Sequence, residues 1–314
     1  MSRRVRMPRA ADARSVLVLT NLRDLAADDV IRRLDAAGVE VLRMNADDCA
    51  REPLPTWSLD SENHAGIGAV WWRQFEIPAE GSPFADPVDE LAVVRAQWRA
   101  WLTTLARPDI PWVNDLWAAR RAEDKITQLR TARSIGFALP ETIITNDPRA
   151  AADFADRRNA VVKTLAAAYF ETSQNGFVYT TALEGALEIP SEAWYAQPVV
   201  VQQRVSGVDI RVVALAGRCF GASCETDVLD WRTAGTGARW TQWEVPGPLA
   251  TLCHQYLRAL NLRYAAFDFV LDGERLWFLE ANQAGEWVFI DRSLGLGIVQ
   301  ALTSLLVDLA AGAP

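Results

Sequence analysis

The chain has 314 residues, half of them hydrophobic and 23% charged, with a net charge of −8. This length allows two or three lobes with cores of their own. The acidic balance argues against nucleic acid and anionic membranes as partners. No apolar run approaches the roughly 18 residues of a membrane span.

The cysteines and the start of the chain indicate a compartment. Four cysteines have no zinc-type spacing, and two histidines are too few to supply metal clusters. We therefore expect a cytoplasmic protein with reduced thiols. The first 14 residues are basic, but only six apolar-rich residues follow them, too few for the core of a signal peptide. We interpret residues 1–14 as a disordered tail.

A first lobe is expected over residues 15–115 as a small α/β domain. Its predicted elements are a strand at 15–20, a helix at 24–37, strands at 39–44, 68–72 and 111–113, and a helix around 88–105. The opening is therefore βαβ. No G-x-G-x-x-G turn follows the first strand, so a dinucleotide fingerprint is absent.

A central lobe is expected over residues 116–200. Its predicted elements are a helix at 115–135, a strand at 140–145, a helix that begins at Pro148 and a strand at 160–163. Lys163 ends that apolar strand, and because an unpaired buried ammonium is costly, its side chain must either reach solvent or meet an anion. We interpret residues 165–176 as a flexible connector of the sort that can cover a ligand. They do not match the Walker A pattern of a phosphate-binding loop.

A C-terminal lobe is expected over residues 201–314. Its predicted elements are strands at 199–205, 208–212 and 218–225, a helix at 246–260, a hairpin at 263–287 and a closing helix at 293–310. Asp209 and Arg211 alternate with apolar residues, so they share one face of their strand; a salt bridge between them is the simpler interpretation. Asp230 and Arg232 lie in a loop, where a weak surface ion pair is likewise the simpler interpretation.

The hairpin carries the most informative polar residues. Apolar runs flank Asp272-Gly273, a strong turn signal, and three polar side chains interrupt them: Asp268, Glu280 and Asn282. Carboxylates are rarely buried without a partner. Oxygen ligands of this kind suit Mg²⁺, which usually takes one or two protein carboxylates beside substrate phosphates. A polar edge strand followed by a loop is the alternative.

The register of this hairpin decides whether the three ligands share a face. A two-residue turn at 272–273 turns Glu280 away from Asp268, because strand side chains alternate. A loop with an odd number of residues, such as 272–274, instead pairs Asp268 with Phe278 and sets Glu280 diagonally on the same face. We therefore predict the odd loop.

The order of these motifs resembles that of the ATP-grasp superfamily. More closely, the chain is similar to the ATP-grasp ribosomal peptide maturases, the graspetide or microviridin-type peptide macrocyclase ligases. The resemblance spans nearly the whole chain in family order and rests on the segments VLVLTNLRDLAADDVIRRL, VWWR, WVNDLWAARRAEDKITQLRTARSIGFALPETIITNDP, VVKT, DIRVVAL, DWR and FDFVLDGERLWFLEANQAGEW. Each motif alone is weak, and together they are specific.

The resemblance implies the ATP-grasp fold, of the α/β (α+β) class, with a pre-ATP-grasp lobe at the N-terminus and ATP between the central and C-terminal lobes. It implies that Lys125 and Lys163 contact nucleotide phosphates, that residues from Gln203 to Val205 present backbone groups to adenine, that Asp209 binds ribose, and that Asp268, Glu280 and Asn282 hold Mg²⁺. Arg211 is implied to balance charge on the transferred phosphoryl group.

In this family ATP phosphorylates a carboxylate, and a nucleophile then attacks the acyl phosphate. The carboxylate belongs to Asp or Glu of a ribosomal precursor peptide with a leader. The nucleophile is a Ser or Thr hydroxyl, which gives an ester, or a Lys amine, which gives an amide. Asp230 and Arg232 match a pattern that meets the core peptide in these ligases, where a guanidinium fork fits a carboxylate. The family also implies a homodimer.

Three departures from the family pattern accompany two alternatives. Thr164 follows Lys163 where relatives usually have proline, the connector lacks a glycine-rich stretch, and Gln203 replaces a frequent Glu. One alternative is an ATP-grasp ligase that acts on free amino acids or protein C-termini. The other is a nucleotide-binding regulator without turnover, although no predicted metal ligand is missing.

Overall fold

The computed structural model describes residues 14–49, 66–73, 75, 88–165, 169–170, 176–177, 180–183, 196–226, 238–273 and 275–312. Contacts within the chain divide it into two compact units. Unit 1 comprises Met1–Ala119, Asn261–Tyr264 and Ala284–Pro314, and unit 2 comprises Arg120–Leu260 and Ala265–Gln283. Residues 284–314 thus group with the N-terminal part, whereas the sequence-based division placed them in one lobe with 201–283.

Unit 1 is built on a parallel sheet with the strand order β2-β1-β3-β4. The strands are β1 (Ser15–Thr20), β2 (Val41–Asn45), β3 (Ile67–Trp72) and β4 (Trp112–Val113). Helix α1 (Leu25–Ala36) joins β1 to β2, and Asp24 caps it by accepting hydrogen bonds from the amides of Ala26 and Ala27. The predicted βαβ opening is confirmed.

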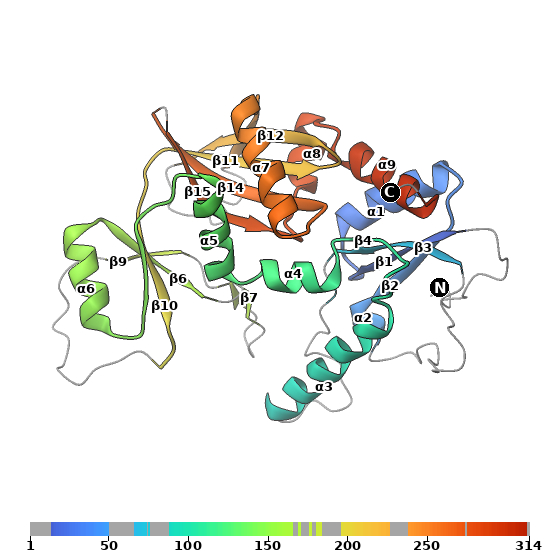
Figure 1. Cartoon of the computed structure of the whole chain (residues 1–314), viewed down its shortest axis with the longest axis horizontal. Helices are drawn as coiled ribbons and strands as arrows, with labels where there is room; N and C mark the ends of the chain where they lie inside the picture. Colours follow the sequence, from blue (N-terminus) through green and yellow to red (C-terminus); the bar gives the residue numbers. More distant parts are fainter. Residues whose placement is uncertain are drawn as a thin grey trace. The chain divides into compact units, whose positions relative to one another are not determined.

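Helices cover both faces of this sheet (Figure 1). On one face α3 (Val88–Trp101) and the 3₁₀ turn η1 (Leu102–Thr104) meet a core that includes Leu17 and Leu19. On the other, α1 and α9 (Ile298–Ala310) pack on each other and on the sheet. A Cβ added at Gly68 would lie 2.7 Å from the Ala310 carbonyl oxygen. The backbones of β3 and α9 therefore touch, which explains why the C-terminal residues belong to unit 1.

The C-terminal helix begins later than predicted and has a companion. The sequence suggested one helix at 293–310, but α8 (Val288–Leu294) and α9 are separate. Gly295 and Gly297 lie between them with φ of 65° and 87°, a conformation that favours glycine and ends a helix. Asp291 then caps α9 by accepting from the amides of Gly297, Ile298 and Val299.

The first sheet of unit 2 is antiparallel, in the order β5-β10-β6-β9. Its strands are β5 (Thr142–Thr145), β6 (Ala160–Thr164), β9 (Thr181–Leu183) and β10 (Val199–Gln203). Helix α6 (Pro148–Arg157) packs on one face through Ala151 and Phe154, against Ala160 and Val201 (Figure 1). Within the predicted connector, β7 (Tyr169–Phe170) and β8 (Gly176–Phe177) form a two-stranded ladder, and the rest of 166–175 lies outside the described residues.

Two helices stand where the sequence suggested one at 115–135. These are α4 (Leu116–Ala122) and α5 (Lys125–Ile135). Asp124 has an extended backbone, and its side chain accepts from the amide of Thr127, so it restarts the helix directly before Lys125. Besides these, the short helix α2 (Ala46–Cys49) follows β2 in unit 1.

The second sheet of unit 2 has five strands in the order β13-β12-β11-β14-β15. They are β11 (Val208–Leu215), β12 (Arg218–Glu225), β13 (Arg239–Trp243), β14 (Tyr264–Asp272) and β15 (Arg275–Asn282), and helix α7 (Gly247–Ala259) precedes β14. An aromatic cluster fills one face of the β14–β15 hairpin: Phe137, Tyr256, Phe267, Phe269 and Phe278, with ring centroids 5.3–6.4 Å apart. The opposite face is left for polar chemistry. Strand β13 was not predicted.

The register of the β14–β15 hairpin corrects the predicted odd loop. Asp272 pairs with Arg275, so only two residues separate the strands, and Gly273 has φ of 61°. A bulge follows, because Phe269 pairs with Phe278 while Asp268 pairs with Glu280. The extra residue turns Phe278 into the aromatic core and Glu280, two residues later, to the other face. The odd loop was wrong, and the shared face of Asp268 and Glu280 is confirmed.

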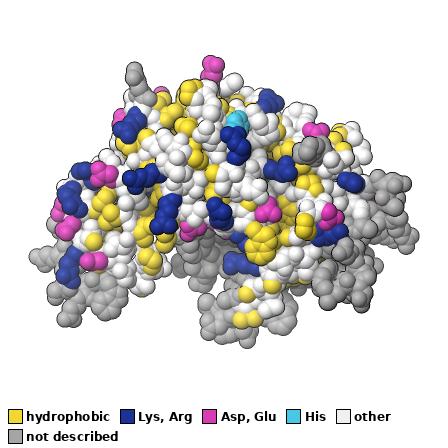
Figure 2. All heavy atoms as spheres, viewed as in Figure 1, with side chains coloured by type: hydrophobic (Ala, Val, Ile, Leu, Met, Phe, Trp, Pro, Cys, Tyr) yellow, Lys and Arg dark blue, Asp and Glu magenta, His cyan; other side chains and the backbone are white. Residues whose placement is uncertain are grey.

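No single helix in the described part of the chain is long and apolar enough to cross a membrane; only α8 and α9 together reach that length and composition, and they meet at a bend of 119°. Basic and acidic side chains are interspersed over the molecular face shown in Figure 2.

Candidate functional site

Two carboxylates and an amide lie together on the polar face of the β14–β15 hairpin. Asp268 is directly opposite Glu280, and Ala266 is directly opposite Asn282. Directly opposed side chains on antiparallel strands have Cβ atoms about 5 Å apart, and two like charges in this position are destabilising. An arrangement that repels itself needs compensating positive charge.

Two cations supply that charge from neighbouring elements. Arg211 of β11 donates from one nitrogen to both carboxylate oxygens of Asp268, at 2.9 and 3.3 Å. Lys125, the first residue of α5, donates to Glu280 at 3.0 Å. The Arg211 side chain is only 6% exposed and that of Lys125 19% exposed, so neither pair is a loose surface contact. Four residues predicted from scattered positions are therefore in one cluster, which we call the acid face: Lys125, Arg211, Asp268 and Glu280.

A buried glutamine fixes the strand that carries two of the predicted metal ligands. Gln128 of α5 accepts a hydrogen bond from the amide of Ala281 at 3.2 Å and donates to the carbonyl of Ala122 at 2.7 Å. Ala281 lies between Glu280 and Asn282. The sequence did not predict this contact of Gln128, because the two residues that it joins are 153 positions apart.

The chemistry of the acid face fits a hard divalent cation. With Asn282 beside it, the acid face offers carboxylate and amide oxygens, which Mg²⁺ prefers, and two carboxylates match the number that Mg²⁺ usually takes from protein. Among the described residues, no group of three or more His, Cys, Asp or Glu side chains could hold a metal ion. Two carboxylates would supply only part of the ligand sphere that Mg²⁺ takes.

The other sheet of unit 2 presents a second predicted cation. Lys163 is the penultimate residue of β6 and donates to the side-chain oxygen of Gln202 at 2.9 Å, and Gln202 in turn donates to the Thr142 hydroxyl at 3.0 Å. These side chains lie on the face opposite α6, because the alternate residues Ala160 and Val201 pack against the helix. Gln202 holds the ammonium in place, a role that the sequence did not indicate.

The segment predicted to meet adenine follows β10. The amide of Gln203 donates to the Glu141 carbonyl at 2.8 Å, and the amide of Arg204 donates to the Asn159 carbonyl at 2.6 Å. The amides of Gln203 and Arg204 are therefore both engaged by backbone carbonyls of unit 2. Asp209 lies on β11 two residues before Arg211, opposite Cys224. Burial, and then the Asp209 carboxylate, raise the pKa of the Cys224 thiol.

Asp230 and Arg232, predicted to meet the peptide, lie outside the described residues.

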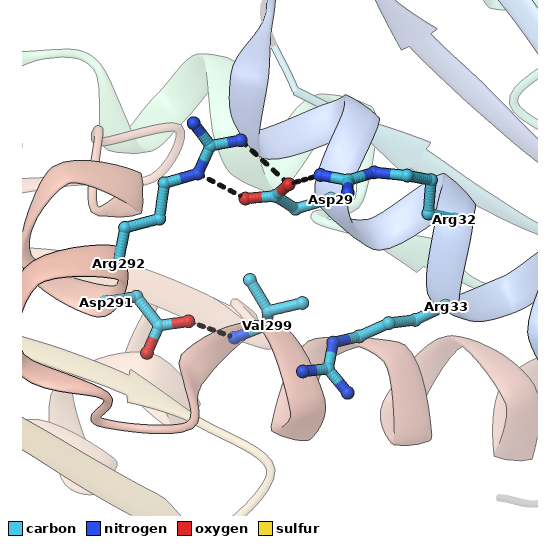
Figure 3. Close-up of a pocket in the computed structure, with 6 residues that line it drawn as sticks. All are labelled: Asp29, Arg32, Arg33, Asp291, Arg292 and Val299. Atoms are coloured by element: carbon cyan, nitrogen blue, oxygen red, sulfur yellow. Dashed lines mark hydrogen bonds and ion pairs between the residues drawn. The ribbon is translucent and has the colours of Figure 1, made fainter.

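A separate pocket of about 370 Å³ lies in unit 1 between α1 and the α8–α9 pair (Figure 3). Two of its arginines bond one carboxylate: Arg292 holds both oxygens of Asp29 at 2.7 and 2.8 Å, and Arg32 also bonds Asp29. The Arg292 side chain is 45% exposed. The Arg292 hydrogen bond lowers the pKa of Asp29. This helix cluster (Asp29, Arg32 and Arg292) contains none of the predicted site residues.

Comparisons with known proteins address the fold. No protein-family model matches the chain, and a comparison with curated proteins found no relative. Solved structures do match. One is a RiPP-associated ATP-grasp ligase from Chryseobacterium gregarium, in complex with ADP and a leader and core peptide; it is 21% identical with a TM-score of 0.79, over 96% of this chain and 98% of that one.

Two further structures agree. The ATP-grasp ligase PsnB, complexed with a precursor variant, Mg and ADP, is 18% identical with a TM-score of 0.77, over 95% and 99% of the two chains. The macrocyclase MdnB from Microcystis aeruginosa is 25% identical with a TM-score of 0.72, over 94% and 99%. The likeness covers both units of the present chain. The protein therefore has the fold of the ATP-grasp ligases.

Proposed function

We propose that this protein is an ATP- and Mg²⁺-dependent ligase that closes macrocycles in a ribosomal precursor peptide. The observation that carries the proposal is the acid face, where Asp268 and Glu280 oppose each other directly and each contacts a cation. The complexes of similar proteins with ADP, Mg and peptides support it.

Such a reaction has two chemical steps. The γ-phosphoryl group of ATP passes to an Asp or Glu side chain of the peptide, and ADP leaves. A Ser or Thr hydroxyl, or a Lys amine, then attacks the acyl carbon; the bond to phosphate breaks and inorganic phosphate leaves. Each ester or amide thus consumes one ATP and removes one water from the peptide.

Charge stabilisation is the main task of a protein in phosphoryl transfer. Lys125 and Lys163 would contact the phosphates, with Lys125 exchanging Glu280 for a phosphate oxygen. Arg211 would balance charge on the transferred group while it orients Asp268. Asp268, Glu280 and Asn282 would hold Mg²⁺, which supplies Lewis-acid stabilisation of the phosphate oxygens when bound. The segment from Gln203 to Val205 would meet adenine, and Asp209 the ribose.

Several broader expectations belong to the same proposal. We propose that the two sheets of unit 2 form the central lobe and, without residues 284–314, the C-terminal lobe, and that unit 1 acts as the pre-ATP-grasp lobe. We propose a cytoplasmic enzyme, because ATP is abundant in the cytoplasm. We also propose a homodimer, as in the resembling family, and a leader-bearing acidic precursor as partner, with neither nucleic acid nor membrane involved.

Substrate choice would depend on Arg232 and Asp230. A chain with a net charge of −8 needs a local cation to hold an acidic core peptide. Arg232→Ala should impair ring formation while ATP affinity stays within a few-fold of wild type. Arg232→Lys should rescue only partly, since a point charge does not replace the guanidinium fork. Unchanged cyclisation by Arg232→Ala would remove this residue from the proposal.

The deciding experiment uses the purified chain with ATP, Mg²⁺ and peptides encoded beside its gene. ADP release together with the loss of one water per bond from the peptide is expected. ADP release with free amino acids or with protein C-termini would instead indicate the other ligase class. ATP binding without ADP release with any peptide would indicate a nucleotide-binding regulator.

A further inference from the structure

An arginine in unit 1 is buried where a parallel sheet usually binds a ligand. In the order β2-β1-β3-β4 the chain adds β2 on one side of β1 and β3 on the other, so the topological switch point lies between β1 and β3. Open α/β sheets bind ligands at this point, outside the carboxyl ends of the strands. Arg73 directly follows β3 and is 2% exposed. Asp24, which follows β1, lies with a carboxylate oxygen 3.7 Å from its Nε.

The chain's own segment 284–286 takes the hydrogen bonds of this arginine. Arg73 donates from one terminal nitrogen to the carbonyl of Ala284 and from the other to the carboxylate of Glu286. The second oxygen of Glu286 accepts from the amides of Trp287 and Val288, at the start of α8. The segment that follows β15 is therefore held by Arg73 and by the backbone amides at the start of α8.

The first strand of the hairpin, β14, is fixed at its start by Asn114, and its first residue, Tyr264, also bonds the segment after β15. The side chain of Asn114 accepts from the amides of Arg263 and Tyr264, at 2.7 and 2.9 Å, and donates to the Tyr264 carbonyl at 2.8 Å. The Tyr264 hydroxyl donates to the carbonyl of Gly285 at 2.5 Å. The first residue of β14 and the segment after β15 are thus joined within unit 1.

The predicted metal ligands lie close to these fixed ends. Asn282 ends β15 two residues before Ala284, and Asp268 follows Tyr264 by four. A site that binds a metal needs its ligands held to within about 0.5 Å by surrounding groups. A strand end without anchors frays.

We infer that Arg73 is a positioning residue of the metal site: by holding Ala284 and Glu286, it fixes the position of Asn282 and Glu280. This inference rests on the proposed function for the role of the metal. It does not rest on it for the effect on the strand, and the two can be measured separately.

The test compares Arg73→Lys with wild type in two measurements. The first is hydrogen exchange of the backbone amides at 280–283 in the protein without ligand. The second is the affinity for Mn²⁺ in the presence of a non-hydrolysable ATP analogue, followed by electron paramagnetic resonance. Lysine keeps the charge but cannot bond two groups as the guanidinium does. We expect faster exchange at 280–283 and Mn²⁺ affinity about tenfold weaker, the loss typical when a group that orients a metal ligand is removed.

The matched control is Arg292→Lys. It makes the same change in another arginine of unit 1 that holds a carboxylate through two bonds. It should leave both measurements within about twofold of wild type. Values for Arg73→Lys equal to those of this control would overturn the inference, because the role of Arg73 would then be confined to the fold of unit 1.

A second variant covers failure of Arg73→Lys to fold. Tyr264→Phe removes only the hydroxyl that bonds Gly285 and should change both measurements in the same direction, by a smaller factor. Wild-type exchange at 280–283 in this variant would contradict the inference. Absence of Mn²⁺ binding by the wild-type protein with nucleotide would refute the proposed function, and exchange alone would then decide whether Arg73 positions the strand.

Discussion

The acid face of unit 2 and the helix cluster of unit 1 contain the same kinds of side chain in different arrangements. In the helix cluster Arg32 and Arg292 share one carboxylate, that of Asp29, so two largely exposed cations surround a single, mostly covered anion. On the acid face two carboxylates oppose each other, and each contacts its own cation, Arg211 of strand β11 or Lys125 of helix α5. Directly opposed carboxylates destabilise a sheet by repulsion, and positive charge beside them offsets this cost. Under the proposed function, the sheet cluster is the one that would bind a ligand, whereas the charges of the helix cluster balance one another.

The largest expected effect separates these two clusters by activity. Asp268→Asn and Glu280→Gln each keep side-chain size and remove a charged metal ligand. We expect ADP formation to fall at least about a thousandfold, since a metal ion contributes several kcal/mol to the transition state. The fold should be nearly intact, as judged by circular dichroism.

The matched change in the helix cluster is Asp29→Asn. Its rate of ADP formation should equal that of wild type. Near-wild-type rates for either acid-face variant would contradict the metal assignment.

Lys125→Met should have an intermediate effect. Methionine fills a similar volume without the charge, and a hydrogen bond to a charged group is worth about 1.5–3 kcal/mol. We therefore expect kcat/KM for ATP to fall roughly ten- to hundredfold, measured by steady-state ADP release. Arg32→Met, which removes an exposed cation from the helix cluster, is the control and should leave kcat/KM unchanged. Equal kinetics for the two variants would mean that Lys125 only balances the charge of Glu280.

The smallest expected effect concerns stability. Arg292→Ala should lower the free energy of unfolding at pH 7 by at most about 1 kcal/mol, because the Arg292 side chain is 45% exposed and solvent screens its interaction with Asp29. Arg292 lowers the pKa of Asp29, so its contribution is present above the unfolded-state pKa of about 3.9 and disappears as pH falls through the folded-state value. Urea unfolding at several pH values checks this. A stability difference that grows as pH falls would contradict it.

The acid face could be predicted from the sequence only in part. Asp268, Glu280 and Asn282 interrupt apolar runs, and that pattern alone indicates a shared function. Their register could not be derived, because period-two alternation assumes a regular ladder. The bulge at Leu279 breaks the alternation between Phe278 and Glu280. No local signal announces such a bulge.

Cross-strand partners were equally hidden. Asp209 and Arg211 suggested an ion pair within one strand, but Arg211 bonds Asp268, 57 residues away. Contacts at this sequence separation depend on which strands become neighbours. Local signals do mark two helix boundaries that differ from the predicted ones: Gly295 and Gly297 follow the end of α8, and Asp124 caps α5. The βαβ opening, by contrast, follows from hydrophobic periodicity alone.

The most direct test of the acid face is a crystal structure with Mn²⁺ and a non-hydrolysable ATP analogue. Anomalous scattering locates Mn²⁺ independently of the protein model. The proposal predicts a peak within coordination distance of Asp268 and Glu280, with Lys125 turned from Glu280 toward a phosphate. A peak elsewhere, with the Lys125–Glu280 and Arg211–Asp268 pairs as they stand here, would contradict it.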